Sequence, residues 1–117
     1  MIDSIKKFRV WHEICHNFGH FKVEDGSHLH INGAPEQFTG LLDRNGNEIY
    51  EGDFLRRVCG GHKHFEHLAT YLVSFDEEMA KFRFIKVGYD GELAPSHVRE
   101  CYEIVGNIHE NEELLNA

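Results

Sequence analysis

Hydrophobic and polar residues alternate with a period of two along most of this chain, a pattern typical of β-strands that bury one face. In residues 7–11 the alternation places Phe8 and Val10 on one face and Arg9 on the other. Further segments of this kind are residues 21–23, 38–42, 48–50, 54–58, 69–75, 81–87 and 103–109. Only residues 111–116 favour a helix, and that helix is short.

Turn signals separate these segments. Asn45-Gly46 is a strong hairpin signal because both residues tolerate a positive φ. Residues 51–53 and 90–91 predict tight turns, and residues 76–80 predict a longer hairpin loop. Many short strands joined by regular turns predict a mostly β fold, either a small barrel or a sandwich.

The length of the chain suits one domain. A chain of 117 residues can build a modest hydrophobic core but not two independent ones. Gly33-Ala34-Pro35 separates an N-terminal strand or hairpin segment, residues 1–33, from a barrel body, residues 36–117. We therefore expect one domain over residues 1–117, made of these two parts.

The charge of the chain is acidic, with 20 acidic and 12 basic residues and a net charge of −8. Proteins that grip nucleic-acid phosphates need the opposite balance, so a nucleic-acid partner is not expected. No apolar run is long enough for a membrane helix, and the N-terminus has no signal-peptide core. These features predict an intracellular protein with no membrane partner.

The three cysteines, Cys15, Cys59 and Cys101, are an odd number at wide spacings. This arrangement argues against a disulfide framework and against a paired-cysteine metal site. We expect buried free thiols at these positions.

Residues 12–16 match the zinc-protease pattern H-E-x-x-H. Zinc binding by this pattern requires a helix, which places both imidazoles on one face. The flanking residues favour strands instead, and on a strand residues four apart lie about 13 Å from each other. The longer form of the pattern also expects histidine where this chain has Lys22. We predict a strand and a turn here, with His12 and His16 too far apart for one zinc ion.

Two other histidine groups are better placed for a metal. His28 and His30 would share one face of a strand, and His62, His64 and His67 lie beside a glycine-rich loop. A zinc site built from these residues is one hypothesis; exposed histidines with ordinary hydrogen bonds are the alternative. No catalytic triad, phosphate-binding loop or nucleotide motif is recognisable. We therefore expect no catalytic residues and no cofactor, with zinc as the alternative.

Three parts of the chain resemble one family in the same order. Residues 37–58 read QFTGLLDRNGNEIYEGDFLRRV, residues 7–11 read KFRVW, and residues 105–115 read VGNIHENEELL. They resemble the YopX family of phage and prophage proteins. The resemblance implies a β pseudo-barrel of short antiparallel strands, capped by a short C-terminal helix, with no established activity.

The shared motif residues are interpreted as structural. Gly40 and Gly52 suit unusual backbone conformations, and Asp43 and Asp53 suit turns in which a carboxylate binds nearby amides. The full set is Thr39, Gly40, Asp43, Asn45, Gly46, Ile49, Tyr50, Glu51, Gly52, Asp53, Gly106 and Asn107.

The family resemblance implies a phage-type accessory protein in the cytoplasm of a bacterial host. We expect it to act without catalysis by binding a macromolecular partner, most simply a protein. An inhibitor of a host defence or regulatory factor is a more specific hypothesis. The alternatives are a metal-binding protein or metal-dependent enzyme and a nucleic-acid-associated protein. Exposed strand edges also suit a homo-oligomer.

Overall fold

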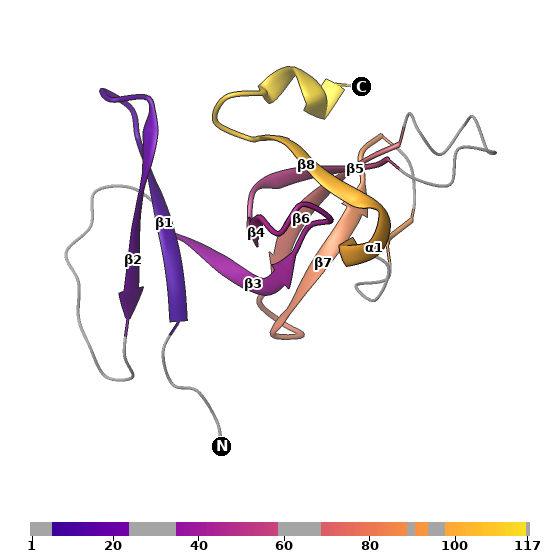
Figure 1. The fold of residues 1–117 in the computed structure, drawn as a ribbon, viewed down its shortest axis with the longest axis horizontal. Coiled ribbons are helices and arrows are strands. Elements are labelled where there is room, and N and C mark those ends of the chain that lie inside the picture. The colour runs from indigo at the N-terminus through magenta and orange to yellow at the C-terminus, as the bar shows by residue number, and fades with distance from the viewer. Residues whose placement is uncertain (1–5, 24–34, 59–68, 89–90, 94–97, 117) are drawn as a thin grey trace. The chain divides into compact units, whose positions relative to one another are not determined.

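A computed structural model describes residues 6–23, 35–58, 69–88, 91–93 and 98–116, and these consist mostly of antiparallel β-strands (Figure 1). The strands form two four-stranded sheets, in the orders β2-β1-β3-β4 and β7-β6-β5-β8. The prediction of a mostly β fold built from short antiparallel strands is confirmed, and one sheet is a half-barrel. The chain divides into two compact units, which we call the N-terminal unit (Met1–Phe38) and the C-terminal unit (Thr39–Ala117).

The N-terminal unit is organised around one hairpin, in which β1 (Lys6–His12) pairs with β2 (Asn17–Val23). The pairing is regular from end to end, and side chains therefore alternate between two faces. Phe8 and Phe21 stack on one face with ring centroids 5.5 Å apart. β3 (Glu36–Leu42) begins in this unit, where its first residues pair with β1.

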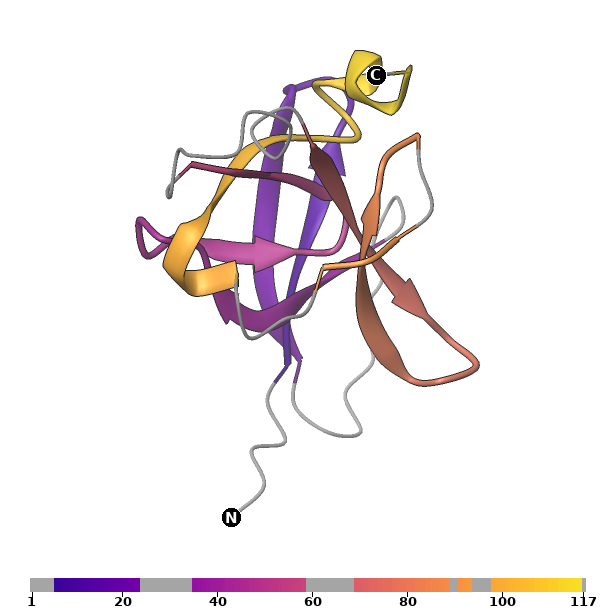
Figure 2. The same cartoon turned by 90° about the vertical axis from the view of Figure 1, so that its right-hand side faces the viewer.

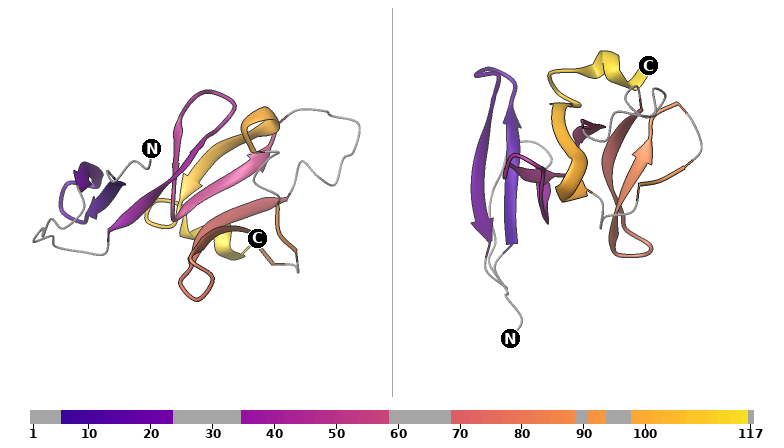
Figure 3. Two further views of the ribbon diagram at one scale, coloured as in Figure 1. Left: turned by 90° about the horizontal axis from the view of Figure 1, so that it is seen from below. Right: turned by 45° about the vertical axis from the view of Figure 1, so that its right-hand side comes forward.

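The C-terminal unit contains the second sheet and the hydrophobic core. Its strands are β4 (Glu48–Tyr50), β5 (Asp53–Arg57), β6 (Thr70–Asp76), β7 (Lys81–Lys86) and β8 (Tyr102–Asn107). Figures 2 and 3 show the curvature of β6, β7 and β8 from three further directions. Alternating apolar side chains bury a core made of Ile49, Leu55, Val73, Phe84, Val98 and Tyr102.

Helical structure is short in the described part of the chain. The predicted C-terminal helix is present as a single 3-10 helix, Glu112–Asn116. A four-residue helix α1 (Val98–Cys101) precedes β8 and was not predicted from the pattern. It buries Val98 in the core, so tertiary contact rather than periodicity accounts for it. None of the helices described is long and apolar enough to cross a membrane.

The predicted turns have the expected backbone. Gly46 has a φ of 83° in the turn between β3 and β4, and Gly52 has a φ of 91° in the turn between β4 and β5. L-amino acids with a Cβ rarely adopt these angles, which explains why glycine occupies both positions.

The cysteine prediction is wrong at two positions. Cys15 is free but exposed, in the turn of the β1–β2 hairpin, and Cys101 is disulfide-bonded. An odd number of widely spaced cysteines does not exclude one pair that the fold brings together. Cys59 lies outside the described residues.

Candidate functional site

Asp43 connects the β3–β4 turn to β8 through one buried carboxylate, which is 2% exposed. Its Oδ1 accepts hydrogen bonds from the backbone amides of Asn45 and Asn47, both at 2.9 Å. Its Oδ2 accepts one from the amide of Ile104 in β8, at 3.1 Å. This carboxylate therefore ties the β3–β4 turn to a strand 61 residues away. Its hydrogen-bonding capacity is used by the backbone.

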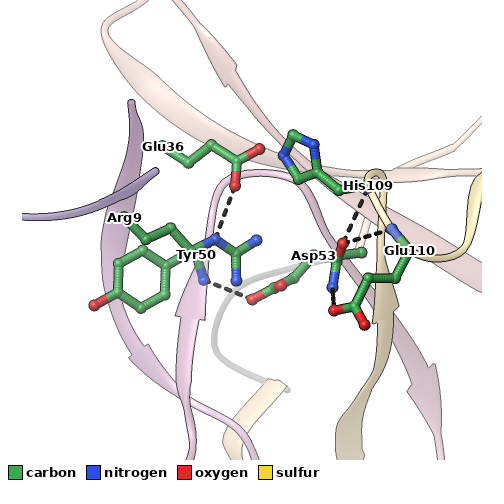
Figure 4. Close-up of polar contacts among 7 residues, drawn as sticks. Arg9, Glu36, Tyr50, Asp53, His109 and Glu110 are labelled. Carbon is green, nitrogen blue, oxygen red and sulfur yellow. Dashed lines mark hydrogen bonds and ion pairs between the residues drawn. The ribbon is translucent and has the colours of Figure 1, made fainter. Parts of the chain in front are cut away.

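Asp53 performs a similar task in the next turn. It is 2% exposed, and its Oδ2 accepts a hydrogen bond from the backbone amide of Tyr50 at 2.8 Å (Figure 4). The Tyr50 hydroxyl in turn donates to Glu48 at 3.1 Å. Gly52, which lies between Tyr50 and Asp53 in this turn, donates its backbone amide to the carbonyl of Val73 in β6 at 2.8 Å. The turn is thereby fixed to β6.

Asn107, the last residue of β8, forms the turn after this strand through hydrogen bonds of its side chain. Its Oδ1 accepts from the amides of His109 and Glu110 at 2.9 and 3.0 Å, and its Nδ2 donates to the Glu110 carboxylate at 2.9 Å. Its own amide donates to Asn111 Oδ1 at 3.2 Å. Gly106 is required next to it, because a Cβ at this position would overlap the Asn111 side chain. These contacts form the turn that follows β8.

Two further motif residues, Thr39 and Asn45, make hydrogen bonds within the C-terminal unit. Thr39 donates its hydroxyl to the carbonyl of Ile49 at 2.8 Å and accepts from the amide of Leu41 at 3.1 Å. Asn45 donates to Glu103 on β8 at 3.1 Å. The contacts of these motif residues thus build turns and connect strands.

The H-E-x-x-H segment is a hairpin turn. β1 ends at His12, β2 begins at Asn17, and the amide of His16 donates to the carbonyl of His12 at 2.8 Å. The predicted strand and turn are confirmed, and the helix that zinc would need is absent. The separation of about 13 Å that a continuous strand would place between His12 and His16 does not apply, because the chain reverses direction between these two residues. The His16 ring lies 6.3 Å from that of Trp11, while His12 lies over Gly19.

The histidines of the proposed zinc site, His28, His30, His62, His64 and His67, all lie outside the described residues. Within the described ranges no three histidine, cysteine or acidic side chains are grouped closely enough to hold a metal ion.

A buried ion pair in the N-terminal unit was not visible in the sequence. Arg9 Nε donates to Glu36 Oε1 at 2.8 Å, and the two side chains are 7% and 8% exposed (Figure 4). The Arg9 guanidinium also lies 4.0 Å from the centroid of the Phe18 ring. The two charged residues are 27 positions apart, and only the pairing of β1 with β3 brings them together.

The β1–β2 hairpin combines a basic charge with exposed apolar surface. Residues 6–23 contain four basic residues and one acidic residue, in contrast to the acidic chain as a whole. Ile14, at the tip, is 94% exposed and lies between other exposed residues. Trp11 packs edge-on against Phe18 with centroids 5.0 Å apart. Among the described residues, this hairpin is the part that best resembles a binding surface.

An exposed ion-pair network lies on the second sheet. Arg83 donates to both carboxylate oxygens of Glu92, at 2.9 and 2.7 Å, and lies 3.6 Å from Asp76. The hydrogen bond from Arg83 lowers the pKa of Glu92 below its ordinary value. Such solvated pairs are ordinary surface features and contribute little to stability.

Comparisons with known proteins address the family and the fold. A solved structure, that of protein EF1440 from Enterococcus faecalis, is similar with a TM-score of 0.64 and 23% identity. The similarity covers 97% of this chain and 99% of that one. No curated protein matches the chain. The family model described as YopX protein matches residues 12–116, so the chain belongs to the YopX family, as its motifs predicted.

Proposed function

We propose that this protein acts without catalysis, by binding a protein partner through the β1–β2 hairpin. The observation that carries the proposal is Ile14, which is 94% exposed at the tip of that hairpin. A large aliphatic side chain in water contributes nothing to folding, but its burial against a partner contributes about 1.5–3 kcal/mol.

The composition of the hairpin supports this proposal. Tryptophan is enriched among the residues that contribute most to binding energy in protein interfaces, and β1 contains the half-buried Trp11. Arg9 is buried, paired with Glu36 and packed on the Phe18 ring, so the strand that carries Trp11 is ordered before any partner arrives.

The contacts of two carboxylates in the family motif support the part of the proposal that the protein acts without catalysis. Asp43 and Asp53 are engaged by backbone amides, which leaves them unsuited to acid–base chemistry. Membership of the YopX family adds the more specific hypothesis that the partner is a bacterial host factor, for example one of defence or regulation, met in the cytoplasm.

Affinity capture with a matched pair of variants tests the proposal. Tagged wild-type protein, Ile14→Asp and Met79→Asp are each exposed to bacterial lysate, and the captured proteins are quantified by mass spectrometry. Met79 is the control, because it is an apolar residue 63% exposed in the β6–β7 turn of the other unit. We expect one partner to be captured by wild type and Met79→Asp, and to be depleted about tenfold with Ile14→Asp.

Two results would count against the proposal. Failure of the wild type to capture any specific partner would remove the binding function. Equal capture by Ile14→Asp, with loss in Met79→Asp, would keep the function but place the surface on the C-terminal unit.

A further inference from the structure

The β3–β4 turn contains an asparagine that is directly followed by a glycine, at Asn45 and Gly46. Both residues are exposed to solvent. The backbone nitrogen that follows an asparagine can attack the side-chain carbonyl carbon of that asparagine, because the product is a five-membered ring. Glycine hinders this attack least, since it has no Cβ. The pair that predicts the hairpin turn is therefore also the pair best suited to ring closure.

Ring closure at this pair would convert the side-chain amide of Asn45 into an acid without a cofactor. The Gly46 nitrogen loses its proton to a base in the solvent and forms a bond to Cγ of Asn45. The bond from Cγ to Nδ2 breaks, and Nδ2 takes up a proton from water and leaves as ammonia. Water then opens the cyclic imide at either of its carbonyl groups, which leaves aspartate or isoaspartate at position 45. Each product carries a negative charge that asparagine lacks.

The folded turn holds both nitrogen atoms that take part in this reaction. The Gly46 amide donates to the carbonyl of Asp43 at 3.0 Å, so the proton of the attacking nitrogen is engaged. Asn45 Nδ2 donates to Glu103 Oε1 on β8 at 3.1 Å, so the side-chain amide is held by another strand. A further hydrogen bond, from the Asn45 amide to Asp43 Oδ1 at 2.9 Å, fixes the backbone of the turn. Ring closure therefore requires the turn to open first.

The modification would also remove a contact between the turn and β8. A carboxylate at position 45 has no hydrogen to donate to Glu103, and the two carboxylates would repel each other. The contact is exposed, so salt would screen this repulsion. Isoaspartate would in addition insert a carbon atom into the backbone between the amides of residues 45 and 47, which share Asp43 Oδ1 as acceptor.

We propose that Asn45 is a site of spontaneous deamidation, which the folded β3–β4 turn suppresses and which chains with an opened turn undergo. The change is irreversible, and the modified turn closes less well because the contact with Glu103 becomes a repulsion. The modification therefore accumulates in an ageing population of the protein as a record of turn opening. The site lies in the C-terminal unit and does not depend on the binding function proposed for the hairpin.

Peptide mass spectrometry of aged full-length protein tests this inference. The protein is incubated at mildly alkaline pH, either in buffer or in concentrated urea, and is then digested under acidic conditions, in which ring closure is slow. Chromatography of the digest separates the peptides with asparagine, aspartate and isoaspartate at position 45. The second Asn-Gly pair of the chain, Asn32-Gly33, lies outside the described residues and provides an internal reference in urea, where the chain is unfolded.

We expect Asn45 to react in urea at a rate similar to that of Asn32, and at least about tenfold more slowly in the folded protein. Glu103→Ala should speed the reaction of the folded protein about threefold, because the side-chain amide is no longer held, and should leave the rate in urea unchanged. Glu113→Ala is the matched control and should leave both rates unchanged. Glu113 is also an exposed glutamate that accepts a hydrogen bond from an asparagine Nδ2, at 3.5 Å.

The stability of the modified turn is measured separately. Asn45→Asp, which reproduces one of the two products, should lower the urea midpoint of unfolding at neutral pH, and the shift should shrink at high salt. In a Glu103→Gln background the same change should lower the midpoint less, because glutamine is uncharged and can donate to the new carboxylate.

The inference is overturned by equal rates at Asn45 in the folded and the unfolded protein, which would show that the turn gives no protection. A rate in urea far below that of Asn32 would show that the pair is unreactive, and aspartate without isoaspartate would exclude ring closure. Equal acceleration by Glu103→Ala and Glu113→Ala, or an unchanged midpoint in Asn45→Asp, would refute the role assigned to the contact with Glu103.

Discussion

Replacement of Gly106 by alanine gives the most direct test of how the closing turn is built. A Cβ at this position would overlap Asn111 Oδ1 and lie 2.7 Å from its Cγ and 3.0 Å from its Cβ. The 3.0 Å contact is with a Cβ, which moves only with its backbone. Relief therefore requires movement of the turn that follows β8, including the contact of Asn111 with the amide of Asn107.

The cost can be estimated from three terms. Overpacking costs about 1–3 kcal/mol, and the loss of one hydrogen bond costs about 1 kcal/mol. The smaller entropy of the unfolded alanine chain offsets about 0.4–1 kcal/mol. We therefore expect Gly106→Ala to lower the free energy of unfolding by about 2 kcal/mol, measured by urea denaturation followed by circular dichroism.

Gly19→Ala is the matched control. It is also a glycine within a strand, but the nearest atom to its added Cβ is the ring nitrogen of His12, at 2.7 Å. His12 is an exposed, rotatable side chain, so the change should alter stability by less than about 0.5 kcal/mol. A Gly106→Ala variant as stable as wild type, or an equal loss in Gly19→Ala, would refute the reasoning.

Three further predictions follow from the described contacts. Asp43→Ala should destabilise the fold by about 2–3 kcal/mol in urea denaturation, because three part-buried backbone amides lose a charged acceptor that is 2% exposed. Asp76→Ala, which removes the acceptor of the exposed hydrogen bond from the Met79 amide, should cost less than about 1 kcal/mol. NMR titration should give Glu92 a pKa below the ordinary value of a glutamate carboxyl, and Arg83→Gln should raise that pKa back toward the ordinary value. The small stabilisation from the Arg83–Glu92 pair is therefore present above the ordinary pKa of glutamate, and it is lost as the pH falls through the lowered pKa of Glu92. The purified protein should contain no stoichiometric zinc by mass spectrometry of its metals, and one zinc per chain would revive the histidine hypothesis.

Local patterns were sufficient to predict most strands and turns. The alternation over residues 81–87 corresponds to β7, and Asn45-Gly46 corresponds to a turn in which Gly46 has a positive φ. These features depend on a few neighbouring residues, which is why the sequence alone reveals them. The strand and turn at residues 12–16 were predicted for the same reason, from β-forming flanks on both sides, whereas the pairing of the two flanks in one hairpin was not.

Features that depend on distant contacts were missed. The Arg9–Glu36 ion pair requires the pairing of β1 with β3, and α1 forms because Val98 is buried in the core. The state of Cys101 likewise depends on the fold and not on cysteine spacing. No periodic signal in one sequence carries this information.

The candidate binding surface was visible only in part. The basic and aromatic composition of β1 and β2 could be read from the sequence, but not which strand would be the edge of its sheet. The exposure of Ile14 could not be predicted from the sequence either, because an aliphatic residue within an H-E-x-x-H pattern is compatible with a helix as well as with an exposed turn. In the structure, the segment that matches the zinc motif forms the tip of the β1–β2 hairpin.

The hydrogen-exchange footprint of the captured partner on the full-length chain tests the central claim most directly. If the β1–β2 hairpin is the binding surface, exchange should slow in residues 6–23 when the partner is added, and should remain unchanged in β5, β6 and β7. Protection confined to the second sheet, with the hairpin exchanging as in the free protein, would contradict the account.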